Sequence, residues 1–123
     1  MKIAVDFDGT IVENAYPSIG KPLPFAFQTL KMLSKEHQLI LWTCREGDLL
    51  TNAVDFCKNN GVEFYAVNKN FPEEDNPKCR KIDADIYIDD RNLDGIPDWG
   101  VIWQKISGQE LQFNSKKHWW KFW

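Results

Sequence analysis

The chain has 123 residues, which suits a single domain with its own hydrophobic core, because domains most often contain about 100–150 residues. With 15 basic and 18 acidic residues scattered along the sequence, the formal net charge is −3, so no broad basic face for nucleic acid is expected. No apolar run approaches membrane-spanning length and the first residues do not resemble a secretory signal, so we expect a cytoplasmic protein without a membrane partner.

The first part of the chain predicts a strand, a helix and a second strand. Residues 2–7, KIAVDF, form a continuous apolar run typical of a strand that is covered on both faces, and residues 38–43, QLILWT, repeat this pattern. Between them, apolar residues spaced four and three apart indicate one face of a helix within residues 22–38. A strand–helix–strand unit of this kind is typical of a parallel sheet.

The second part of the chain continues the alternation. Residues 46–61 carry a helical apolar stripe that closes with Asn-Asn-Gly, and residues 62–67, VEFYAV, predict a third strand. Residues 68–81 are polar and contain two prolines, so we expect mostly loop there. We expect a fourth strand at residues 84–90, ADIYIDD, and a fifth at residues 99–104, WGVIWQ. The sequence therefore predicts an α/β domain with a mainly parallel, five-stranded sheet.

Polar residues follow the predicted strands at the points where these end. Asp6 and Asp8 close the first strand, Thr43 closes the second, and Asp89 and Asp90 close the fourth. Parallel strands bring their carboxyl ends to one edge of the sheet, where ligands of α/β proteins bind. Clustered carboxylates with a hydroxyl suit Mg²⁺, which prefers oxygen ligands, and a carboxylate is also able to attack phosphorus as a nucleophile.

Charged residues near the same edge are further candidates for the site. Lys81 and Lys78 precede the fourth strand, where either would supply a cation to balance the carboxylates. Arg45 and Glu46 follow Thr43, and we expect both to be exposed, solvated charges, with contact to a substrate as the alternative.

The pentapeptide DFDGT at residues 6–10 resembles the first motif, DxDGT, of the haloacid dehalogenase (HAD)-like superfamily of phosphatases. In that superfamily a Thr or Ser ends the second strand, a Lys precedes the fourth, and an acidic pair ends the fourth, and this chain has matching residues in the same order. The resemblance covers residues 3 to about 104. It implies a three-layer α/β/α sandwich with a Rossmann-like sheet of the HAD type.

The resemblance also implies roles for individual residues. Asp6 would be the nucleophile that forms an aspartyl-phosphate, and Asp8 the general acid and then the general base. The implied ligands of a Mg²⁺ cofactor are Asp6, Asp8 through its backbone carbonyl, and Asp89 or Asp90.

The implied phosphate contacts are Thr43 and a lysine. Lys81 lies closest to the position where similar small members carry their lysine, and Lys78 is the alternative. The resemblance therefore predicts a phosphatase, a phosphomonoester hydrolase, with a phosphorylated substrate that the sequence does not identify.

The chain between Asp8 and Thr43 is too short to hold both the predicted helix and a cap domain, so we expect a small capless member. Capless members use macromolecular substrates or cover the site with a neighbouring subunit. Residues 13–22 and 68–80 are the local candidates for a partial lid.

The C-terminal residues 116–123, KKHWWKFW, contain four aromatic residues among the last five. Aromatic residues interleaved with lysines are able to stack on nucleic acid bases, or to pack on the same domain or on a second copy of the chain. The acidic net charge favours packing or a homo-oligomer formed through this tail.

Two readings compete with the phosphatase. A receiver-like phospho-acceptor also uses acids, a Thr and a Lys around Mg²⁺, but it carries its acidic pair at the first strand and its phosphorylated Asp at the third. Here the DxD pair comes first, and residues 62–67 end without an acid. A non-catalytic phosphate-binding module of the same fold is the second alternative, and the intact set of acids argues against it.

Overall fold

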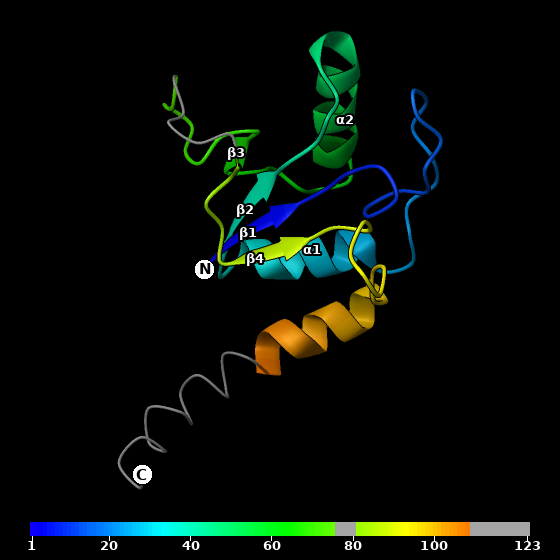
Figure 1. The fold of residues 1–123 in the computed structure, drawn as a ribbon, viewed down its shortest axis with the longest axis vertical. Helices are drawn as coiled ribbons and strands as arrows, with labels where there is room; N and C mark the ends of the chain where they lie inside the picture. Colours follow the sequence, from blue (N-terminus) through cyan, green and yellow to red (C-terminus); the bar gives the residue numbers. More distant parts are fainter. Residues whose placement is uncertain (76–80, 109–123) are drawn as a thin grey trace, which may run out of the picture.

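The computed structural model describes residues 1–75 and 81–108, so the aromatic segment 116–123 lies outside the described residues. Four parallel strands form one sheet in the order β3-β2-β1-β4 (Figure 1). The strands are β1 (Lys2–Val5), β2 (Gln38–Leu41), β3 (Ala66–Val67) and β4 (Ile86–Ile88). The expected α/β architecture with a parallel sheet is therefore confirmed, with four strands rather than five in the described residues.

The central strand β1 is apolar on both faces, as its sequence predicts. Ile3, Ala4 and Val5 are fully buried, because β2 and β4 pair with the two edges of β1 and apolar side chains pack on both of its faces. Val5 is level with Leu41 of β2 and Ile88 of β4, so the residues that follow these three strands emerge side by side. This register is what brings the polar strand ends together.

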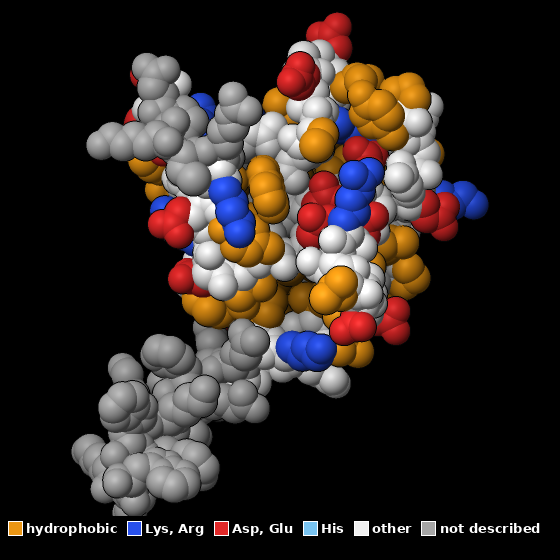
Figure 2. Space-filling model, in the orientation of Figure 1, with side chains coloured by type: hydrophobic (Ala, Val, Ile, Leu, Met, Phe, Trp, Pro, Cys, Tyr) orange, Lys and Arg blue, Asp and Glu red, His pale blue; other side chains and the backbone are white. Residues whose placement is uncertain are grey.

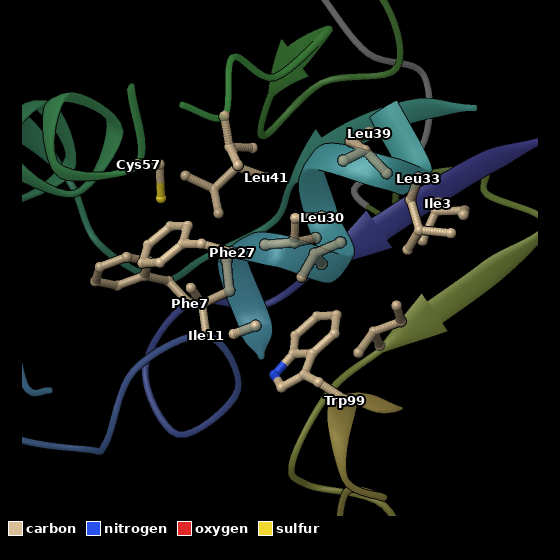
Figure 3. Close-up of a cluster of buried hydrophobic side chains, with 14 of the residues drawn as sticks. Ile3, Phe7, Ile11, Phe27, Leu30, Leu33, Leu39, Leu41, Cys57 and Trp99 are labelled. Carbon is tan, nitrogen blue, oxygen red and sulfur yellow. The ribbon is translucent and has the colours of Figure 1, made fainter. Parts of the chain in front are cut away.

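The helices pack on the face of the sheet that carries Ile3 and Val5. They are α1 (Ala26–Ser34), α2 (Gly47–Asn59) and a helix whose described part covers residues 99–108. Figure 3 shows their buried side chains meeting those of the strands in one core. The helix residues in this core include Phe27, Leu30, Leu33, Ala53, Cys57, Trp99, Ile102 and Ile106. On the opposite face, Ala4 and Ile40 pack in a separate small cluster with Ile82.

The prediction of a fifth strand at residues 99–104 is wrong, because residues 99–108 are helical. Trp99, Ile102 and Ile106 are buried at spacings of three and four, whereas Val101 is exposed. This is helical periodicity, and the short apolar run WGVIWQ is equally compatible with a strand when its neighbours are ignored.

The third strand is also shorter than the predicted 62–67. No helix within residues 1–75 and 81–108 is long and apolar enough to cross a membrane.

Trp99 connects the helix 99–108 to the turn that follows β1. Its side chain is 2% exposed and points into the core, beside Ile11 and α1 (Figure 3). The indole Nε1–H donates a hydrogen bond of 2.9 Å to the backbone carbonyl of Thr10. Because Thr10 is fully buried, this bond satisfies a carbonyl that water does not reach.

We expect Trp99→Phe to lower the free energy of unfolding by about 1–3 kcal/mol, because it removes this buried hydrogen bond and leaves a small cavity. Urea unfolding followed by far-ultraviolet circular dichroism measures the change. Trp103→Phe is the matched control, since Trp103 is only partly buried at the edge of the same core. Equal losses in the two variants would contradict the anchoring role of Trp99.

Candidate active site

A cleft of about 760 Å³ lies beyond the carboxyl ends of the strands. In Figure 2 acidic side chains gather there, together with basic ones, on the side toward which the strand arrows of Figure 1 point. The charged and hydroxyl side chains that line the cleft are Asp6, Asp8, Thr43, Arg45, Asp89 and Arg91. The predicted convergence of strand ends therefore occurs for Asp6, Asp8, Thr43 and Asp89, which line the cleft, and for Asp90, whose carboxylate lies beside those of Asp6 and Asp89, whereas Lys81 does not line the cleft.

The turn at residues 6–10 is shaped by Gly9 and Thr10. Gly9 has φ of +81°, and a Cβ atom built there would lie 2.3 Å from Oδ2 of Asp90, so no side chain fits. The hydroxyl of Thr10 donates to Oδ2 of Asp6 over 3.2 Å and accepts the backbone N–H of Asp90 over 3.1 Å. Thr10 thus ties the end of β1 to the end of β4.

Three carboxylates form a group that is suited to a cation. Asp6, Asp89 and Asp90 each offer an oxygen, and these oxygens all lie within 4.8 Å of one another. Hard oxygen donors at this spacing fit Mg²⁺, which is held by a few carboxylates and keeps several waters. The carboxylate of Asp8 is not part of this group, and the use of its backbone carbonyl as a ligand stays a prediction.

The environment of Asp6 opposes its negative charge. Burial raises the pKa of Asp6 to about 7 from its ordinary 3.8, and the nearby charge of Asp89 adds to this rise. The backbone N–H of Phe7 acts in the opposite direction, while Asp90 raises the pKa of Asp6 further. A cation among these carboxylates would favour the ionised form, so this electrostatic arrangement fits a bound metal.

Asp8 and Arg45 form a paired unit beside the carboxylate group. The guanidinium of Arg45 donates from Nε to Oδ2 of Asp8 over 2.8 Å and from Nη2 to Oδ1 over 2.7 Å. Arg45 is 1% exposed, so the expectation of a solvated charge at this position is wrong. Its neighbour Glu46 is exposed, as expected. The sequence analysis named Arg45 as a candidate but missed its burial, because its partner Asp8 is 37 positions away in the sequence and no local pattern predicts such a pair.

Thr43 is oriented by residues that the sequence analysis did not single out. Its backbone N–H donates to Oδ1 of Asn68 over 2.8 Å, and its Oγ1 accepts the backbone N–H of Arg45 over 3.2 Å. Asn68 follows β3 with φ of +55°, a conformation that Asn tolerates better than most residues. The end of β3 therefore positions the predicted phosphate contact at the end of β2.

The predicted lysine lies outside the cleft. The side chain of Lys81 is exposed, and its Nζ lies 4.8 Å from the centre of the Tyr87 ring, which packs against Trp42. Lys78 lies outside the described residues. Arg91, which follows the acidic pair directly, lines the cleft and is a cation that the sequence analysis did not consider.

Comparison with known proteins gives one informative match. No family model matches the chain, and no curated protein does. Among solved structures, a conserved protein coded by a locus of Bacteroides thetaiotaomicron is 57% identical in sequence and matches with a TM-score of 0.86. The match covers 89% of this chain and 91% of that chain, so the two share the arrangement of strands and helices described above.

The raised pKa of Asp6 predicts how the stability of the metal-free protein depends on pH. Because the folded state favours protonated Asp6, this contribution is complete below the ordinary pKa of 3.8 and is lost as the pH rises through about 7. In the presence of a chelator, we expect wild type to lose stability relative to Asp6→Asn as the pH rises from about 4 to about 8. Urea unfolding at a series of pH values measures this difference.

Asp55→Asn, which removes an exposed carboxylate of α2, is the matched control for the change of charge. Adding Mg²⁺ at the alkaline end of the series should restore the stability of wild type more than that of Asp6→Asn. A constant difference between wild type and Asp6→Asn across the pH range would contradict the assignment.

Proposed function

This chain belongs to the same family as the conserved Bacteroides thetaiotaomicron protein, and we propose that it is a magnesium-dependent phosphomonoesterase that works through a phosphorylated Asp6. The observation that carries the proposal is the group of three carboxylates around Asp6 at the end of the central strand. A group of this kind is able to bind a hard cation next to a nucleophilic oxygen. Metal-assisted phosphoryl transfer to a carboxylate requires both at one point.

The DFDGT motif at residues 6–10 supports membership of the HAD-like superfamily as part of this proposal. The absence of a cap and the cytoplasmic location belong to the same proposal, and so does the three-layer α/β/α form, although the helices of the described residues all pack on one face of the sheet. The substrate is a phosphate ester whose alcohol part enters the cleft of about 760 Å³.

Asp6, Asp89 and Asp90 would hold Mg²⁺, with the backbone carbonyl of Asp8 as a further ligand. When bound, the ion supplies positive charge that offsets the charge of the phosphoryl group and keeps Asp6 ionised. Thr43 Oγ1 and Arg91 line the cleft and are placed to donate hydrogen bonds to phosphate oxygens. Lys81 lies against Tyr87 and outside the cleft. It would therefore contact phosphate only after a movement of the segment before β4.

In the first step an Oδ atom of Asp6 attacks phosphorus, and the bond from phosphorus to the leaving oxygen breaks. Asp8 enters this step in its protonated form and donates the proton to that oxygen, so the alcohol leaves uncharged and Asp8 remains as the carboxylate that pairs with Arg45. In the second step water attacks the phosphorus of phospho-Asp6 and gives its proton to Asp8, which releases phosphate and regenerates both carboxyl groups. Each oxygen of Asp8 accepts one hydrogen bond from Arg45 and keeps a lone pair for this proton.

The receiver-like alternative is disfavoured by the residue that follows β3. A receiver would carry its phosphorylated Asp there, whereas this chain has Asn68, whose side chain is used to hold Thr43. A non-catalytic phosphate-binding module remains the second reading. Hydrolysis assays over a panel of phosphate esters, with Mg²⁺ and with a chelator, separate it from the enzyme, because a binding module would release no phosphate from any ester.

We expect Asp89→Asn or Asp90→Asn to weaken Mg²⁺ binding by at least about tenfold, because each removes one charged ligand from the carboxylate group. Isothermal titration calorimetry with Mg²⁺ and the Mg²⁺ dependence of hydrolysis measure the change. Asp94→Asn, at an exposed carboxylate in the connection after β4, is the control. Wild-type affinity in both variants would show that these acids do not bind the metal.

We expect Asp8→Asn to accumulate phosphate on Asp6 when p-nitrophenyl phosphate is the substrate. This activated ester needs little help from an acid in the first step, whereas hydrolysis of phospho-Asp6 still needs a base, a role typically worth about 10²–10⁴-fold in rate. Mass spectrometry of the peptide that contains residues 3–12 should detect a hydroxylamine-labile phosphate.

Asp6→Asn is the matched control, because it keeps the shape of the side chain but removes the nucleophilic charge. It should acquire no label and should release no p-nitrophenol. Labelling of any other residue, or full activity in Asp6→Asn, would overturn the mechanism.

A further inference from the structure

Arg45 is buried to an extent that is unusual for a cation that lines an open cleft. It is 1% exposed, and its bidentate contact with Asp8 uses only part of its hydrogen-bonding capacity. Arg and Lys are almost never fully buried unless they are paired. Its remaining contacts therefore indicate what else the side chain holds in place.

Those remaining contacts all go to one segment or to the ring next to Asp8. Nη1 donates to the carbonyl of Pro17 over 3.1 Å, and Nη2 donates to the carbonyl of Ser18 over 2.9 Å. The guanidinium carbon also lies 5.2 Å from the centre of the Tyr16 ring and 5.1 Å from that of Phe7. One planar group thus connects Asp8 to residues 13–22, which we call the 13–22 loop.

The 13–22 loop is an excursion whose two ends meet. The backbone N–H of Glu13 donates to the carbonyl of Lys21 over 2.7 Å, and Gly20 lies so close to the Glu13 carbonyl that a Cβ would be 2.1 Å from it. Between these ends the residues from Asn14 to Ser18 are exposed. Asn14 and Tyr16 nevertheless line the cleft, so the loop forms part of its wall.

We propose that Arg45 is a positioning residue whose guanidinium holds Asp8 and the 13–22 loop in one fixed arrangement, so that the loop forms the leaving-group side of the cleft. Asp8 protonates the leaving oxygen in the proposed reaction, so a wall attached to Asp8 lies where the alcohol part of the ester must sit. On the phosphate side, Thr10 donates to Asp6 and Asn68 accepts from Thr43, and neither of these two residues belongs to the loop. This inference rests on the proposed phosphatase function for its kinetic consequences.

The test compares Arg45→Lys and Arg45→Met with wild type in the full chain with Mg²⁺. Lys keeps the charge but not the planar fork that reaches two carboxylate oxygens and two carbonyls at once. In both variants we expect hydrogen exchange of backbone amides in residues 13–19 to rise at least about tenfold, with exchange in α1 unchanged. Arg91→Met, which removes a cation from the same cleft, is the control and should leave exchange of the loop unchanged.

Kinetics separate positioning from a general structural effect. With p-nitrophenyl phosphate we expect kcat to fall by about 10²-fold, because Asp8 is displaced, and KM to rise, because the wall around the leaving group is loosened. Inhibition by inorganic phosphate should be unchanged, since phosphate occupies only the side formed by Asp6 and Thr43. Wild-type kcat together with wild-type exchange of the loop in Arg45→Lys would overturn the proposal.

Tyr16→Leu gives a second test that leaves the ion pair between Asp8 and Arg45 intact, in case the Arg45 variants fail to fold. It should raise exchange in the loop and KM for the aryl ester, and unchanged values of both would contradict the proposal. Exchange does not depend on turnover. If wild type hydrolyses no ester, the phosphatase function is disproved. If exchange of the loop nevertheless rises in Arg45→Met, the attachment of the loop to Arg45 is still established.

Discussion

Mutual repulsion among carboxylates is the constraint on which the rest of this structure depends. Asp6, Asp89 and Asp90 place oxygens within 4.8 Å of one another at the end of a sheet. Like charges at that spacing raise the energy of the folded state unless a proton or a cation offsets them. The surrounding contacts hold the group together against this repulsion: Thr10 bridges two of the strand ends, and Trp99 holds the carbonyl of Thr10 from the core. The fold thus keeps a locally unfavourable charge arrangement in place with buried, uncharged contacts.

The negative charge of Asp8, in the same cleft, is offset in a different way. Asp8 lies two residues from Asp6, but its charge is offset within the protein by Arg45. The two aspartates of the DFDGT motif therefore differ in what they need from outside the chain. A proton or a cation from solution would offset charge only on the side of Asp6, because Arg45 already pairs with Asp8 and also holds a segment of the loop. This difference matches the division between a nucleophile and an acid–base group in the proposed reaction.

The sequence predicts the parts of the structure that depend on local pattern and on strand order. The strand β1 follows from a continuous apolar run and the helices α1 and α2 from apolar periodicity, and parallel pairing then places Asp6 and the acidic pair at one edge. The helix 99–108 was not predicted, because a six-residue apolar window does not distinguish a strand from a buried helical turn. The burial of Arg45 and the use of Asn68 were missed for another reason. Both depend on partners distant in the sequence, which no local pattern encodes.

The central position of β1 in the sheet has a consequence for how the chain folds during translation. Of the four strands of the sheet β1 is made first, yet one of its two neighbours is β4, which lies more than eighty positions later in the chain. Contacts this distant in sequence close late, because the intervening loop must lose its conformational freedom first. Until translation has passed Asp90, Ile3 and Val5 therefore expose an unpaired strand edge that is prone to aggregation. An early β1–β2 pair does not close this edge, because β2 occupies the opposite edge of β1.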